Sequence, residues 1–131
     1  MNKIQPPNIP VPKGHYSPAV EHNGLIFVSG QLPWNYETGE VETGAIELQT
    51  ELALRNIETI LVAANSDLNH VLQMTIYISE MELWDKVNEI YVRILGDHKP
   101  ARAIVPVKEL HFGTQIEIQA IAISTNEKLK M

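Results

Sequence analysis

The stretch Gln115-Ile116-Glu117-Ile118-Gln119-Ala120-Ile121-Ala122-Ile123 decides the fold. Its first half alternates polar and apolar residues, which is typical of a β-strand with one polar face. Its last four residues are apolar on both faces, so both faces of the sheet that contains them need cover. The stretch therefore predicts a sheet with something packed against each side.

The remaining elements follow from hydrophobic spacing and turn signals on either side of this strand. Asn23-Gly24 is a two-residue hairpin signal between strands expected at 19–21 and 25–29. Apolar residues recur at helical spacing over 45–65 and 81–95, and further strands are expected over 71–78 and 101–107. The side chains expected to face the core are Leu48, Leu52, Ile57, Ile60, Leu61 and Ala64 on the first helix, Leu72, Met74, Ile76 and Ile78 on the strand that follows it, and Leu83, Val87, Ile90, Tyr91 and Ile94 on the second helix.

The order β-β-α-β-α-β-β predicts one α+β domain over residues 1–131. Residues 1–13 contain four prolines and are expected to form an extended N-terminal arm, and 34–44 a surface loop. Helices at 45–65 and 81–95 can cover only one face of a sheet of about five strands. Because no other element is left for the second face, the sequence predicts a homo-oligomer that packs sheet faces together.

Composition limits the classes of function. The chain has no cysteine, so disulfides, thiolate metal sites and a cysteine nucleophile are excluded, as expected for a reducing cytoplasm. No apolar run has the length of a signal peptide or a membrane span, which predicts a soluble protein. A net charge of −6 with scattered basic residues disfavours nucleic acid and favours a small-molecule site.

Arg102 lies near the start of an apolar strand, on the same face as Ile104 and Pro106. A guanidinium in such surroundings needs a partner, and a ligand carboxylate suits its planar fork. An edge arginine that reaches water explains the pattern equally well.

Glu117 lies in the middle of the last strand. If its face is covered, its carboxyl group has the raised pKa that suits acid–base catalysis; if not, it belongs to a solvated polar face. Tyr16, Ser29 and Asn88 could contact a ligand or have structural roles. The sequence contains no catalytic or metal-binding motif, and the histidines are widely spaced: His15, His22, His70, His98 and His111.

Five segments occur together in a characteristic order: Phe27-Val28-Ser29-Gly30-Gln31-Leu32-Pro33, Thr38-Gly39-Glu40, Val87-Asn88-Glu89-Ile90-Tyr91, Pro100-Ala101-Arg102 and Ile116-Glu117-Ile118-Gln119-Ala120-Ile121-Ala122. This set resembles the RidA (YjgF, or L-PSP endoribonuclease-like) family over residues 14–123. The resemblance implies a chorismate-mutase-like subunit, a homotrimer with clefts between subunits, and cofactor-independent and metal-independent hydrolysis of 2-imino or enamino acids to 2-keto acids and ammonia.

The resemblance also implies roles for particular residues. Arg102 matches the arginine that holds the substrate carboxylate, and Glu117 the acid that positions the attacking water. Substrate-binding positions match at four further residues, which are Tyr16, Ser29, Asn88 and, through its backbone carbonyl, Ile104.

The chain also departs from the family pattern. Ile104 replaces a frequent cysteine, so thiol-dependent behaviour is not expected. The loop at 96–99 is short and the turn at 110–113 is unusual, and both are expected to border the cleft and alter substrate choice. His111 and Phe112 could line the pocket or form a plain turn. Two alternatives to the deaminase remain, a non-catalytic module that binds small carboxylates and, less in keeping with the charge, a ribonuclease or translation inhibitor.

Overall fold

The computed structural model describes residues 1–125. Within them six strands form one mixed sheet in the order β1-β2-β3-β8-β6-β7. The strands are β1 (Asn2–Ile4), β2 (Ala19–His22), β3 (Leu25–Gln31), β6 (Val71–Ile78), β7 (Ala101–Pro106) and β8 (Ile116–Ile123). Neighbouring strands are antiparallel except β6 and β7, which are parallel.

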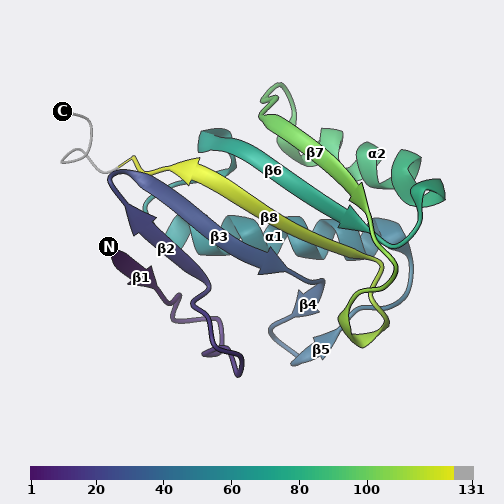
Figure 1. Ribbon diagram of the computed structural model, residues 1–131, viewed down its shortest axis with the longest axis horizontal. Helices are drawn as coiled ribbons and strands as arrows, with labels where there is room; N and C mark the ends of the chain where they lie inside the picture. The colour runs from purple at the N-terminus through teal and green to yellow at the C-terminus, as the bar shows by residue number, and fades with distance from the viewer. Residues whose placement is uncertain (126–131) are drawn as a thin grey trace.

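Helices α1 (Ile46–Ala63) and α2 (Trp84–Leu95) lie against the same face of the sheet, behind it in Figure 1. The 3₁₀ turns η1 (Leu68–His70) and η2 (Met81–Leu83) come directly before β6 and α2, and η3 (His111–Gly113) precedes β8. The predicted arrangement, with two helices on one face of a mixed sheet, is confirmed.

The core lies between the helices and one face of the sheet. On β8 it includes Ile116, Ile118, Ala120 and Ala122, which are at most 3% exposed. The opposite face carries Glu117 and Gln119 and then Ile121 and Ile123, and Ile123 is 39% exposed. Phe27 on β3 is 43% exposed. This open face has apolar side chains that no element in residues 1–125 covers, as the last strand predicted.

The N-terminal segment differs from the expected extended arm. Asn2–Ile4 pairs with Ala19–Glu21 and forms the outer strand β1 of the sheet. Ile9 is 7% exposed and joins the hydrophobic core. The three-residue strand has no alternation long enough to detect in the sequence, and its pairing is set by the strand beside it.

Two expected core positions are wrong. Leu48 on α1 is 46% exposed, whereas Gln49 next to it is fully buried. Leu72 on β6 is 45% exposed because the register between β6 and β8 shifts between Val71 and Gln73. A bulge adds one residue to a strand and reverses which side chains face inward before it, so Val71 replaces Leu72 in the core.

The region 34–44 is more regular than the predicted loop. It contains a short hairpin of β4 (Trp34–Asn35) and β5 (Glu40–Val41). Asn56 on α1 holds this hairpin by donating from Nδ2 to the carbonyl of Leu32 at 3.2 Å and to that of Trp34 at 2.9 Å. The hairpin therefore lies against α1 beside the end of β3.

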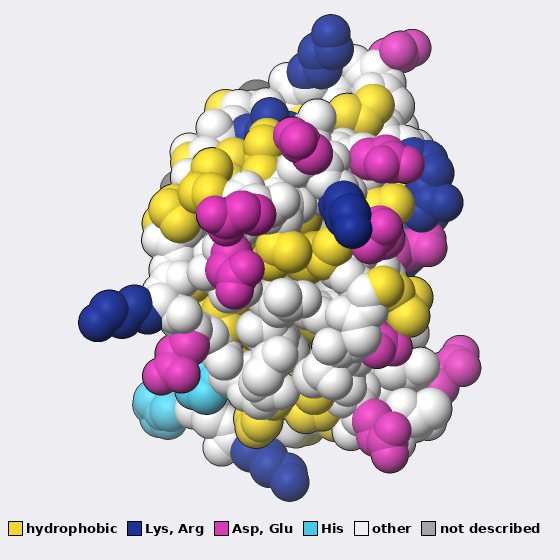
Figure 2. All heavy atoms as spheres, turned by 90° about the vertical axis from the view of Figure 1, so that its right-hand side faces the viewer, with side chains coloured by type: hydrophobic (Ala, Val, Ile, Leu, Met, Phe, Trp, Pro, Cys, Tyr) yellow, Lys and Arg dark blue, Asp and Glu magenta, His cyan; other side chains and the backbone are white. Residues whose placement is uncertain are grey.

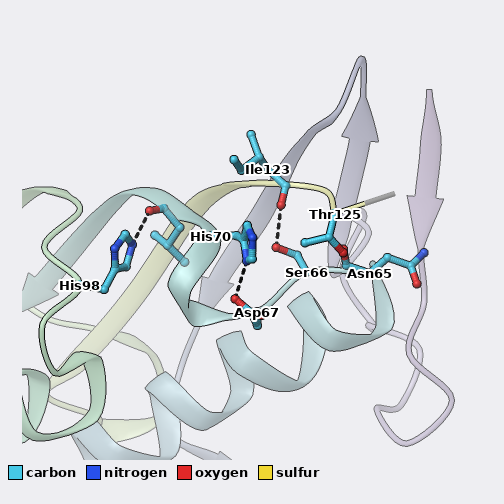
Figure 3. A network of polar contacts seen from close by, with 8 residues as sticks. Asn65, Ser66, Asp67, His70, His98, Ile123 and Thr125 are labelled. Carbon is cyan, nitrogen blue, oxygen red and sulfur yellow. Dashed lines mark hydrogen bonds and ion pairs between the residues drawn. The ribbon is translucent and has the colours of Figure 1, made fainter. Parts of the chain in front are cut away.

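The C-terminal ends of α1 and β8 are joined by polar contacts at one end of the sheet's central strands (Figure 3). Ser66 Oγ donates to the carbonyl of Ile123 at 2.7 Å, and Thr125 Oγ1 donates to that of Asn65 at 2.7 Å. His70 Nδ1 lies 2.6 Å from Asp67 Oδ1 in the turn between α1 and β6. These bonds fix the helix end against the last strand, far along the chain.

Candidate functional site

Arg102 lies on β7, the edge strand that runs parallel to β6. Its register partner is Met74, a fully buried side chain beneath the helices, so Arg102 points to the helix-covered face. There it meets α2. Its guanidinium carbon lies 4.7 Å from the ring centroid of Trp84 and 4.9 Å from that of Tyr91, and Nη1 donates to Asn88 Oδ1 at 3.0 Å.

The spacing of Trp84, Asn88 and Tyr91 explains this arrangement. Residues four and seven apart lie on the same face of a helix, so α2 presents an aromatic ring, an amide and a second ring in one row. Cation–π contacts and the amide bond together hold the guanidinium in one orientation. Asn88 could be identified as a candidate from the sequence, whereas Trp84 could be found only through its four-residue spacing from Asn88, a signal that the prediction did not use.

The guanidinium keeps donors for a ligand. Arginine carries five N–H groups in a planar fork, and the bond to Asn88 uses one of them. Within residues 1–125 no carboxylate forms an ion pair with Arg102. An oriented and partly exposed guanidinium of this kind can bind a carboxylate bidentately.

A groove of about 410 Å³ opens beside Arg102, between α2 and the loop that precedes β7. It is lined by Asn88, Tyr91, Val92, Leu95, Gly96, His98, Lys99, Pro100 and Arg102. The loop at 96–99 therefore borders the same space as Arg102, as the sequence predicted for this loop.

Glu117 lies on the opposite face of the sheet. It pairs in register with Tyr77, three residues along β6 from Met74, and alternation places Tyr77 and Glu117 on the open face. Burial raises the pKa of the Glu117 carboxyl group, and the nearby His111 lowers it in part. Within residues 1–125 no hydrogen bond or ion pair satisfies this carboxylate, which leaves it free to bind water or a proton.

Gly30 on β3 makes room for Glu117. A Cβ atom at residue 30 would lie 2.7 Å from Glu117 Oε2 and 2.9 Å from Cδ, closer than real contacts allow. The Ser-Gly-Gln segment therefore allows the carboxylate to lie directly against the backbone of the neighbouring strand.

Ser29 precedes Gly30 on β3, and Tyr16 lies in the segment before β2. Ser29 Oγ donates to the carbonyl of Ser17 at 2.6 Å, which ties the segment after Tyr16 to β3. Tyr16 is 58% exposed. Burial raises the pKa of Tyr36 to about 12, with a further contribution from Tyr16, so the two phenols are neighbours.

The turn before β8 also borders Glu117. His111 lies close enough to interact electrostatically with the Glu117 carboxyl group and lowers its pKa in part. Phe112 has a φ of 61°, is 63% exposed and packs edge-to-face on Trp34 with ring centroids 5.4 Å apart. The turn 110–113 is thus anchored to the β4 hairpin.

The candidate residues fall into two groups within one subunit. Arg102 and Asn88 contact each other beside α2, and Ile104 follows on the same face of β7, partly buried against the core. Glu117 lies on the open face against Gly30, the residue that follows Ser29 on β3, whereas Tyr16 lies near Tyr36. Residues 1–125 contain no cluster of His, Cys, Asp or Glu that could hold a metal ion. None of the helices in this range is long and apolar enough to cross a membrane.

A family model described as Endoribonuclease L-PSP matches residues 7–124. The chain belongs to the RidA (YjgF) family. A RutC family protein of Pyrococcus horikoshii is 43% identical over 115 residues, which cover 88% of this chain and 91% of the relative.

Two further similar proteins have names that bear on the site. The mouse 2-iminobutanoate/2-iminopropanoate deaminase is 36% identical over 114 residues, covering 87% of this chain and 84% of the mouse protein. The crystal structure of Escherichia coli TdcF with bound serine superposes with a TM-score of 0.89 at 30% identity. The superposition covers 95% of this chain and 100% of the TdcF chain.

Proposed function

We propose that this protein hydrolyses reactive 2-imino or enamino acids to 2-keto acids and ammonia, without a cofactor or metal. The observation that carries the proposal is the oriented guanidinium of Arg102, which is held by Asn88 and two aromatic rings and has no carboxylate partner within residues 1–125. The named activity of the mouse relative supports the reaction, and serine bound to TdcF supports a small carboxylate as the ligand.

The site is completed by a second copy of the chain. Arg102 and Glu117 project from opposite faces of one sheet, so one subunit cannot apply both groups to one small substrate. Packing the open faces of three subunits around an axis would cover the exposed Phe27 and Ile123 and bring the Glu117 of one subunit to the edge strand β7 of the next. We therefore propose a homotrimer with a cleft at each subunit boundary.

In this cleft Arg102 and Asn88 bind the substrate carboxylate, and Glu117 accepts a proton from a water molecule. The water oxygen forms a bond to the carbon of the protonated imine, and the electron pair of the C=N π bond moves to the nitrogen, which becomes a neutral amine. Glu117 then passes its proton to this amine. A lone pair of the hydroxyl oxygen forms the C=O bond of the keto acid as the C–N bond breaks, ammonia leaves, and the hydroxyl proton passes to Glu117. A raised pKa suits Glu117 to this exchange, because a general base works best near the operating pH.

The other candidate residues have supporting positions in this proposal. Tyr16 and Ser29 border the water side of the cleft, and the backbone of Ile104 lies on the edge strand beside the carboxylate. Acidic and basic side chains are interspersed on the surface in Figure 2, and this distribution supports a small-molecule site over a nucleic-acid site. A cytoplasmic location stays a prediction from the sequence.

The test is a coupled assay that generates 2-iminopropanoate or 2-iminobutanoate in situ and follows the release of ammonia and keto acid. We expect the wild-type protein to accelerate release and Arg102→Ala to abolish the acceleration. Arg55→Ala is the matched control, because Arg55 is an exposed α1 arginine paired with Glu58. Equal rates of ammonia and keto-acid release with and without wild-type protein would contradict the deaminase. If keto acids still bind, the protein would then be a module that only binds carboxylates.

A further inference from the structure

The groove beside Arg102 extends well beyond the guanidinium. Its volume of about 410 Å³ falls in the range of sites that hold much larger ligands than a three-carbon imino acid. From Arg102 it continues along Tyr91 and Leu95 of α2 to the loop that contains Lys99. The walls contributed by Val92, Leu95 and Pro100 are apolar, so a ligand chain could lie between them.

The charge of the groove is opposite to that of the whole chain. The chain has 16 acidic and 10 basic residues, yet the groove lining contains Arg102, Lys99 and His98 and neither Asp nor Glu. Within residues 1–125 Lys99 forms no ion pair. A groove with cations at two positions and no acid in its walls complements a ligand with two negative groups.

Tyr91 provides an independent indication of a ligand. The residue is 5% exposed, it lines the groove, and its hydroxyl is buried beside the guanidinium of Arg102, which can only donate to it. Within residues 1–125 no acceptor lies within hydrogen-bond geometry of the hydroxyl proton. A buried hydroxyl whose proton has no acceptor costs free energy, so such groups in native proteins call for a missing acceptor. An anionic oxygen beside Arg102 would accept this bond.

The loop is held so that Lys99 stays near Arg102. Gly96 ends α2 with a φ of 61°, a conformation that favours glycine. His98 Nε2 donates to the carbonyl of Val71 at 2.8 Å, which fixes the loop to the start of β6 (Figure 3). Because Lys99 and Arg102 are three residues apart, their Cα atoms are separated by at most roughly 10 Å.

We propose that this groove makes the protein selective for 2-imino acids with a second carboxylate at the end of the side chain. Arg102 binds the carboxylate next to the imine carbon, and the Tyr91 hydroxyl donates to the same group. Lys99 binds the distal carboxylate. This inference rests on the proposed function and specifies its substrate class.

The experiment compares two keto-acid products of equal length by calorimetry on the full chain. 2-Oxopentanedioate carries the distal carboxylate and 2-oxopentanoate lacks it. We expect the diacid to bind about fivefold more tightly, as for one partly exposed ion pair, and the preference to shrink in 1 M salt. Lys99→Gln should remove the preference, whereas Lys108→Gln, an exposed lysine outside the groove, should keep it. Tyr91→Phe should weaken the binding of both acids.

Equal affinity of the two acids in the wild type, or a preference that survives Lys99→Gln, would overturn the inference. The coupled assay with the imines of glutamate and norvaline separates this failure from that of the proposed function. Hydrolysis of both imines at equal efficiency would leave the deaminase standing without the selectivity. A diacid preference that depends on Lys99, without hydrolysis of either imine, would keep the groove assignment and reject the deaminase. If neither acid binds and neither imine is hydrolysed, both are wrong.

Discussion

Arg102 and Glu117 project from opposite faces of the same sheet, Arg102 from edge strand β7 toward α2 and Glu117 from β8 toward the open face. Strand alternation and the registers with Met74 and Tyr77 fix this relationship. A reaction that needs both groups therefore needs two copies of the chain, and each subunit contributes one half to each of two sites.

Mixing two inactive variants tests this sharing. We expect Arg102→Ala and Glu117→Gln each to lack deaminase activity, since one loses the carboxylate anchor and the other the base. After the two proteins are unfolded and refolded together in equal amounts, about a quarter of the clefts should combine an intact Arg102 with an intact Glu117 from the neighbouring copy. The recovered rate is measured in the coupled assay. Recovery of no activity from a refolded mixture of normal oligomeric size would argue that each site lies within one subunit.

The loss in Arg102→Ala has an expected size. In the proposed cleft the bound substrate buries the charge pair. Removing one partner of such a pair costs on the order of 2–5 kcal/mol, so kcat/KM should fall by at least about 30-fold. Arg102→Lys should recover only part of the rate, because an ammonium group cannot replace the planar fork. Size-exclusion chromatography should give the wild-type oligomer for both variants. A variant with full activity would refute the role of Arg102.

The sequence predicted the positions of the helices and strands better than it predicted which face of the sheet each side chain occupies. Long periodic segments defined α1, β6, α2 and β8 because many residues contribute to each pattern. The alternation of side chains along a strand showed that Arg102 shares a face with Ile104. It could not show whether Glu117, on another strand, lies on the same face of the sheet. That relation depends on the register between strands, which is set by pairing across distant segments. For the same reason the bulge at Val71 and the strand at Asn2–Ile4 could not be predicted.

Gly30 should be required for the position of Glu117. In Gly30→Ala the new methyl group would meet Glu117 Oε2 at 2.7 Å, so the carboxylate must move and activity should fall more than stability. Gly44→Ala is a matched control, because its methyl group would meet Glu42 Oε2 at 2.8 Å in a surface loop where that side chain can swing away. Adding Glu117→Asp to Gly30→Ala shortens the acid and should return part of the rate. Equal losses in the two glycine variants would contradict this reasoning.

The Glu117 carboxyl group should give the stability a defined pH dependence. Burial raises its pKa, so the folded state holds the proton more tightly than the unfolded state. The contribution of this group to stability is therefore greatest below the ordinary pKa of a glutamate and falls as the pH rises through the raised pKa. In Glu117→Gln this fall should disappear, while Glu40→Gln on the exposed hairpin should keep it. In His111→Gln the fall should shift to higher pH, because the charge that lowers the pKa of Glu117 is lost.

Urea unfolding of these variants across the acidic and neutral range measures the effect. Catalysis should follow the opposite course, since the rate requires the ionised carboxylate and rises through the same pKa. A fall in stability with pH that is unchanged in Glu117→Gln would assign it to another group.

For two neighbouring residues on α1, truncation of the polar side chain should lower the free energy of unfolding more than truncation of the apolar one. Gln49 is fully buried, where its Nε2 donates to the carbonyl of Gly44 at 2.9 Å and its Oε1 accepts from the backbone N–H of Gln115 at 2.8 Å. Gln49→Ala leaves both backbone groups unpaired and should lower the free energy of unfolding by about 2–4 kcal/mol. Leu48 is 46% exposed, so Leu48→Ala should cost less than about 1 kcal/mol. Chemical denaturation of the two variants measures the difference, and a larger loss in Leu48→Ala would mean that Leu48 is buried in the assembled protein.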